Sequence, residues 1–149
     1  MSAKTIRNRL VIAAAVVCHI GCGASPITSS RIEHALASTF ASLVQVQIVR
    51  LGLPPLPASD ITVNASCHRL VPDSGSRGSG DWVCSLAWFG PNRTRLEDTY
   101  DLTVGTDACY TATLDGTNTG LGGPTVPAAD GSFMRNLLYA FDGCFDPTR

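Results

Sequence analysis

Four cysteines limit the fold of this chain more than any other feature of its sequence. They are Cys67, Cys84, Cys109 and Cys144. An even number of cysteines in a short exported chain predicts disulfides, and four cysteines allow three pairings. We favour Cys67–Cys84 with Cys109–Cys144, because each bridge closes one contiguous half of the sequence. No CxxC pair occurs and the spacings match no zinc pattern, so no bound metal is expected.

The first 21 residues predict that the chain is exported. Lys4, Arg7 and Arg9 precede an uncharged apolar stretch at residues 10–20. A basic segment followed by a short apolar one is the layout of a secretory signal peptide. The stretch is shorter than the roughly 20 residues that a membrane-spanning helix needs. We therefore expect residues 1–21 to be removed as a signal peptide of the lipoprotein type.

The end of this segment predicts whether the mature protein is attached to the membrane. Ile20-Gly21-Cys22 resembles the lipobox of bacterial lipoproteins, in which a lipid is attached to the cysteine sulfur and cleavage makes that cysteine the new N-terminus. His19 stands where that family usually has an aliphatic residue. Cys22 is expected to carry a lipid, which would anchor the protein on the extracytoplasmic face of the cell membrane. The alternative is cleavage after Gly23-Ala24, which would release a secreted protein.

Removal of the signal peptide also changes the charge. The full chain has 11 Lys and Arg and 12 Asp and Glu, a formal net charge of −1. Cleavage before Cys22 removes three basic side chains and no acidic one, so the mature chain has a formal net charge of −4. An acidic chain is not expected to bind nucleic acid, which requires a basic face, nor to adhere to anionic lipid through its charge.

Residues 31–149 are expected to form one domain after a short tether at residues 22–30. Ser30-Arg31-Ile32-Glu33 fits a capping box, in which Ser30 caps the helix and Glu33 reaches back. Apolar residues follow at the helical period, which predicts a helix to about Gln47 with one buried stripe. They are Ile32, Ala35, Leu36, Phe40, Leu43 and Val44. The proline-rich run at residues 53–57 must end the helix, since proline lacks an amide donor.

The remainder alternates between apolar and polar residues, as an antiparallel sheet does. The expected strands are residues 61–67, 82–88, 99–104 and 109–114, and residues 133–141 are ambiguous between strand and helix. Cys67 and Cys84 both fall on the apolar side of their strands, which supports their pairing. The expected fold class is therefore α+β, with one N-terminal helix packed on an antiparallel sheet of four to five strands and two disulfides.

The sequence contains no GxSxG, HExxH or P-loop motif. We therefore expect no enzymatic activity and no cofactor. His34 is expected on the helix surface, and His68 faces away from its neighbour Cys67. An envelope hydrolase that uses His68 with Asp73 and Ser74 remains an alternative, although neighbours in sequence do not establish the geometry of a triad.

Two further features concern the strands. Asp98 and Asp101 lie near turns, where carboxylates commonly cap the backbone. Trp82 and Trp88 share one side of their strand, and Phe89 lies on the other. If the helix covers only one face of the sheet, Phe89 and Tyr110 could form an exposed binding patch. The alternative is that these aromatic residues belong to the core.

Taken together, Cys22, the capped helix, the hairpin Cys67…Trp82-Val83-Cys84 and the strand Asp107–Ala112 make the sequence similar to small exported lipoproteins of actinobacteria, particularly mycobacteria. Most members of that group have no assigned activity. The leading hypothesis is a non-enzymatic, membrane-tethered extracytoplasmic module that binds an envelope protein or another envelope component, because the chain is expected to form a compact disulfide-held α+β domain without a catalytic motif. A carrier that holds a small apolar ligand between helix and sheet is a third alternative, and it would need an enclosed apolar cavity.

Overall fold

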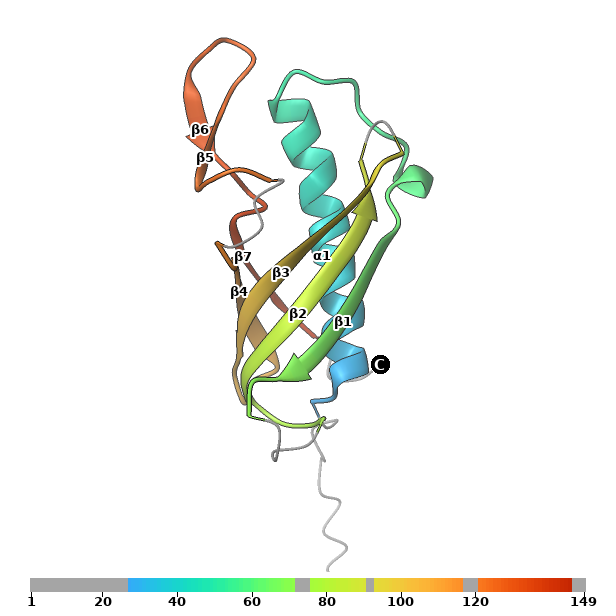
Figure 1. Ribbon diagram of the computed structural model, residues 1–149, viewed down its shortest axis with the longest axis vertical. Helices are drawn as coiled ribbons and strands as arrows, with labels where there is room; N and C mark the ends of the chain where they lie inside the picture. The colour runs from blue at the N-terminus through green and yellow to red at the C-terminus, as the bar shows by residue number, and fades with distance from the viewer. Residues whose placement is uncertain (1–26, 72–75, 91–92, 117–120, 146–149) are drawn as a thin grey trace, which may run out of the picture.

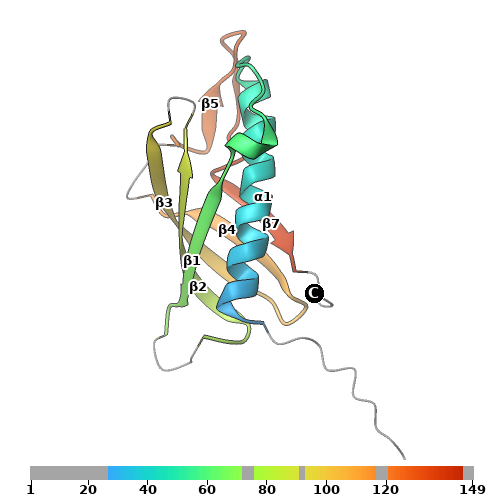
Figure 2. The ribbon, with the colours of Figure 1, turned by 90° about the vertical axis from the view of Figure 1, so that its right-hand side faces the viewer.

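A long helix, α1 (Ser29–Arg50), lies across one face of a five-stranded antiparallel sheet, which confirms the expected α+β fold (Figures 1 and 2). This computed structural model describes residues 27–71, 76–90, 93–116 and 121–145. The predicted signal peptide and Cys22 lie outside these ranges. Within them, no helix has the length and hydropathy needed to span a membrane.

The sheet has the strand order β1-β2-β3-β4-β7. Its strands are β1 (Val63–Arg69), β2 (Gly80–Phe89), β3 (Arg95–Val104), β4 (Cys109–Leu114) and β7 (Ala140–Cys144). A separate two-stranded ribbon consists of β5 (Thr125–Pro127) and β6 (Phe133–Arg135). The ambiguous stretch at residues 133–141 is thus neither one strand nor one helix, because it contains β6, a turn and the start of β7.

The helix begins earlier than the sequence predicts, and the capping-box prediction is wrong. Thr28 is the N-cap, and its side chain accepts a hydrogen bond from the Arg31 amide at 3.4 Å. Thr28 can take this role because it is extended, with φ −128° and ψ 156°, and bridges to Arg77. The Glu33 carboxylate instead accepts a hydrogen bond from the Cys67 amide at 2.9 Å. It therefore joins the helix to the sheet rather than closing the helix end.

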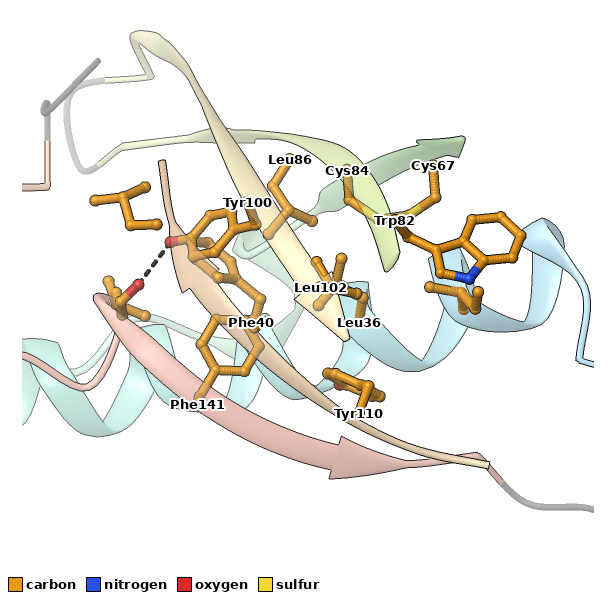
Figure 3. Close-up of a cluster of buried hydrophobic side chains, with 14 of the residues drawn as sticks. Leu36, Phe40, Cys67, Trp82, Cys84, Leu86, Tyr100, Leu102, Tyr110 and Phe141 are labelled. Atoms are coloured by element: carbon orange, nitrogen blue, oxygen red, sulfur yellow. Dashed lines mark hydrogen bonds between the residues drawn. A yellow bond between two sulfur atoms is a disulfide. The ribbon is translucent and has the colours of Figure 1, made fainter. Parts of the chain in front are cut away.

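The helix packs on the sheet through a stripe of apolar residues that meets the inward side chains of all five strands. Phe40 lies at the centre, with ring centroids 4.8 Å from Trp88, 5.9 Å from Tyr100 and 6.1 Å from Phe141. The buried Tyr100 hydroxyl donates a hydrogen bond to the Leu138 carbonyl at 2.6 Å (Figure 3). These rings occupy the space between helix and sheet, where an apolar ligand carrier would need its cavity.

Both predicted disulfides form, and each joins an edge strand of the sheet to its neighbour. Cys67 on β1 is bonded to its register partner Cys84 on β2. Cys109 on β4 is bonded to its register partner Cys144 on β7. Because β1 and β7 are the two edges, the covalent cross-links reinforce the strands that have hydrogen-bonded neighbours on one side only.

The chain enters the fold at one end of the long axis. The Ser29 amide donates to the Ser76 carbonyl at 3.2 Å, and the Gly78 amide donates to the Ile27 carbonyl at 2.9 Å. Ile27–Ser29 is therefore held beside the segment that leads into β2. We call this the entrance end of the molecule. The opposite end holds the last turn of α1, the end of β2 and the β5–β6 ribbon (Figure 1).

Candidate binding surface

Phe89 is the exposed aromatic residue that the sequence proposes for binding, and it lies at the end of β2. Its side chain is 47% exposed on the outer face of the sheet, which the helix leaves uncovered. Trp82 and Trp88 are buried on the inner face, as their shared parity predicts. Phe89 is thus placed on the surface by the same alternation that places its neighbour Trp88 in the core.

This side chain lines a pocket of about 330 Å³, which we call the Phe89 pocket. Its lining residues come from three separate segments and are Leu56, Asp60, Phe89, Gly90 and Arg93. Leu56 belongs to the proline-rich connector after α1, and Asp60 ends the short 3₁₀ helix η1 (Ala58–Asp60). Sequence reasoning missed both, because only the path of the connector around the end of the sheet brings them to Phe89.

The turn between β2 and β3 fixes the position of Arg93. The Arg93 amide donates to the Gly90 carbonyl at 2.9 Å, and the Gly90 amide donates to the Thr94 carbonyl at 2.9 Å. Arg93 itself has a φ of 56°, in the left-handed region that non-glycine residues rarely adopt. The close turn therefore holds the Arg93 backbone at the rim of the pocket.

Charges of both signs border the Phe89 pocket. Asp60 and Arg93 both line it. Arg95, the register partner of Phe89, forms an ion pair with Glu97 at 3.1 Å. This pair is well exposed, so its contribution to folding stability is small. An apolar centre with a charged rim is the composition typical of protein-binding surfaces.

The prediction that Tyr110 belongs to an exposed patch is wrong. Tyr110 is only 2% exposed and lies on the helix side of β4, in phase with Ala112 and Leu114. Its hydroxyl donates to Thr39 Oγ1 at 3.0 Å. A methyl group on Gly143 would lie 2.5 Å from this hydroxyl, so the glycine leaves room for the ring. Burial raises the pKa of Tyr110, and the hydrogen bond between its hydroxyl and Thr39 partly offsets this shift.

His34 and His68 do not line the Phe89 pocket. His34 is exposed on α1, and His68 is exposed on the outer face of β1, with Val83 as its register partner. Asp73 and Ser74, the other residues of the hydrolase alternative, lie outside the described residues. Among the residues that the structure does describe, no group of three or more His, Cys, Asp or Glu side chains could hold a metal ion.

Asp98 lies inside the fold rather than at a turn, which corrects the capping role predicted for it. Because β3 already starts at Arg95, Asp98 is an inward residue of the strand and only 3% exposed. Its Oδ1 atom makes no hydrogen bond to any described residue. Burial raises the pKa of this carboxyl above its ordinary value. Asp101, its predicted partner, points to the outer face and is exposed.

Asp98→Asn is expected to change the pH dependence of stability. A carboxyl whose pKa is raised in the folded state is neutral in both states at low pH, and it destabilises the fold as pH rises through the folded pKa. The Asn variant has no carboxyl at this position, so its folding stability does not fall in this way as pH rises. It should therefore gain stability relative to the natural protein between acidic and neutral pH, as measured by urea unfolding at both. The exposed Asp101→Asn is the control. A difference between Asp98→Asn and the natural protein that does not change with pH would contradict this account.

Comparison of the chain with protein-family models, with curated proteins and with solved structures gives no match. The functional argument therefore rests on the surface just described and on its position relative to the predicted anchor.

Proposed function

We propose that this protein is a membrane-tethered extracytoplasmic module that binds an envelope protein through the Phe89 pocket. The observation that carries the proposal is the position of an exposed aromatic side chain in a pocket at the end of the sheet opposite the entrance end. If a lipid on Cys22 holds the entrance end at the membrane, the Phe89 pocket faces away from the bilayer. A partner could reach the pocket there without competing with the lipid surface.

The size and chemistry of the pocket favour a protein partner. Its volume of about 330 Å³ is at the small end of the range of about 300–1,000 Å³ that pockets for small molecules span. An apolar side chain that projects from a partner could enter between Leu56 and Phe89. Aromatic and arginine residues carry much of the binding energy at protein interfaces, and Phe89 and Arg93 supply one of each. Asp60 and Arg93 would then orient the partner by their opposite charges.

The proposal can be tested with the mature lipidated protein as bait in detergent-solubilised envelope. The natural protein should recover the same partner in repeated experiments, as measured by quantitative mass spectrometry. Phe89→Ser should reduce that recovery, because loss of a central aromatic anchor typically costs about 2 kcal/mol or more, which corresponds to roughly thirtyfold in affinity. Asp60→Arg should also reduce it, since it reverses the charge on one side of the pocket.

Phe133→Ser is the matched control, because Phe133 is an exposed phenylalanine on the β5–β6 ribbon. It should leave recovery unchanged. All three variants change exposed positions, and thermal unfolding should show that each retains its fold. Recovery of the same proteins by the natural chain and by Phe89→Ser would overturn the proposal.

A further inference from the structure

A second apolar feature lies at the entrance end of the molecule. Leu70 and Val71 follow directly after β1, and each is 61% exposed. They are two adjacent large hydrophobic residues with most of their surface in contact with solvent. Isolated exposed hydrophobic residues are common, but an adjacent pair at one end of a long molecule indicates a contact surface.

Backbone contacts fix this pair beside the point where the chain enters the fold. The Leu70 amide donates to the Asp81 carbonyl at 3.1 Å, which continues the pairing of β1 with β2 beyond Arg69. The Arg69 guanidinium donates to the Arg77 carbonyl at 2.7 Å and to the Ser79 carbonyl at 2.8 Å. The same segment holds Ile27–Ser29 through Ser76 and Gly78. Leu70–Val71 and the entering chain are therefore bound to one short stretch of backbone.

The predicted anchor would bring this end close to the bilayer. Five residue steps separate Cys22 from Ile27, and a fully extended chain covers at most about 18 Å over that length. The polar layer on each side of the hydrocarbon core is roughly 6 Å thick. A lipid on Cys22 thus keeps Ile27 within about 18 Å of the lipidated residue, so the entrance end can approach the headgroups.

We infer that Leu70 and Val71 form a second membrane contact that inserts into the interface of the lipid bilayer. The inference rests on the lipid anchor of the proposed function. The charges near the pair are mixed: Arg69 precedes Leu70 and contacts the backbone of Arg77, while Asp81 and Asp101 line a pocket together with Leu70. The contact is therefore apolar rather than electrostatic, and it should persist at high salt. Together with the anchor it fixes the orientation of the domain and holds the Phe89 pocket away from the membrane.

Site-specific photo-crosslinking to lipid tests this contact. A benzophenone derivative of phenylalanine replaces Val71 in the mature lipidated protein, which is reconstituted into vesicles of equal parts phosphatidylglycerol and phosphatidylcholine. The same residue at Phe89 or at Phe133 provides matched controls at the opposite end. Illumination should add the mass of one lipid to the protein with the probe at position 71, at low and at high salt alike. The two control positions should give no adduct above background.

The outcomes separate this contact from the anchor on which it rests. Mass spectrometry of the mature N-terminus is done first. An N-terminus without an acylated Cys22 would overturn both the anchor and the contact. An acylated Cys22 with no lipid adduct at position 71, or with equal adducts at positions 71 and 89, would overturn the contact alone. An adduct at position 71 that disappears at high salt would show an electrostatic attachment and would also contradict the inference.

Discussion

Phe40→Ala is expected to lower the free energy of unfolding by about 3–5 kcal/mol, the range found when a large buried aromatic side chain is truncated. Phe40 is fully buried and contacts aromatic rings from β2, β3 and β7. Its removal would leave a cavity between helix and sheet that the cross-linked edge strands could not close by moving inward. Urea unfolding followed by circular dichroism measures the loss.

Val49→Ala is the control for this experiment, because it also truncates an apolar residue of α1 but at an exposed position. Its effect should stay within about 0.5 kcal/mol, as is usual for surface substitutions. A loss below about 1 kcal/mol for Phe40→Ala would show that the helix contributes little to the core, because core truncations of this size otherwise cost several times more.

Removal of the Cys109–Cys144 bridge by the double substitution to alanine should cost about 4 kcal/mol, and removal of Cys67–Cys84 about 3 kcal/mol, on the chain-entropy estimate. The difference follows from the sequence separations, which are 35 and 17 residues. The longer loop loses more freedom in the unfolded state when it is closed. Urea unfolding under oxidising conditions compares the two variants with the natural protein.

The Cys109–Cys144 variant should lose more folding stability than the Cys67–Cys84 variant, and this order tests the entropic account more strictly than either value does. Both bridges join an edge strand to its neighbour, but Cys67 and Cys84 are buried, whereas Cys109 is half-buried and Cys144 is exposed. A larger loss for the Cys67–Cys84 variant would contradict the entropic account. It would point instead to packing of the fully buried Cys84 side chain.

The fold class and the disulfide pairing could be predicted from the sequence because both depend on local periodicity. The apolar stripe around Phe40 has the helical period, and the alternation around Cys67 and Cys84 places both sulfurs on one side of a hairpin. The register confirms that placement, since these two cysteines are direct partners. Strand β4 has the predicted bounds. The Cys109–Cys144 pairing is the exception, because these cysteines are 35 residues apart and the sequence favours their pairing only because it closes one contiguous half of the chain.

The errors concern contacts between segments that are distant in sequence. Glu33 fits a capping box locally, but its carboxylate binds the Cys67 amide. For Tyr110 the sequence leaves both an exposed patch and the core open, and the contact with Thr39 on the distant helix α1 belongs to the core alternative. Residues 133–141 look like one apolar element, but Asn136 is buried where it donates to the carbonyls of Leu121 and Gly123. No local pattern predicts such a polar contact.

The Phe89 pocket likewise combines one residue that could be predicted from the sequence with others that could not. Phe89 could be named from strand parity alone, because Trp88 beside it has the pattern of a core residue. Leu56, Asp60 and Arg93 could not, since the proline-rich connector and the β2–β3 turn meet only in the folded chain. The proline run is the signal that could have suggested Leu56 and Asp60, because it ends the helix and starts the connector that leads to them.

The position of the disulfides at the two edges bears on the timing of folding. Strands β1, β2, β3 and β4 follow one another in sequence and pair as neighbours, so they can assemble while the thiols are still reduced. Strand β7 completes the sheet, and the two edge strands β1 and β7 are linked covalently to their neighbours only on oxidation. A chain of this design would keep both edges of the sheet without covalent links in a reducing compartment and gain these links in an oxidising one. The stability of the completed sheet would thus depend on the redox state of its surroundings.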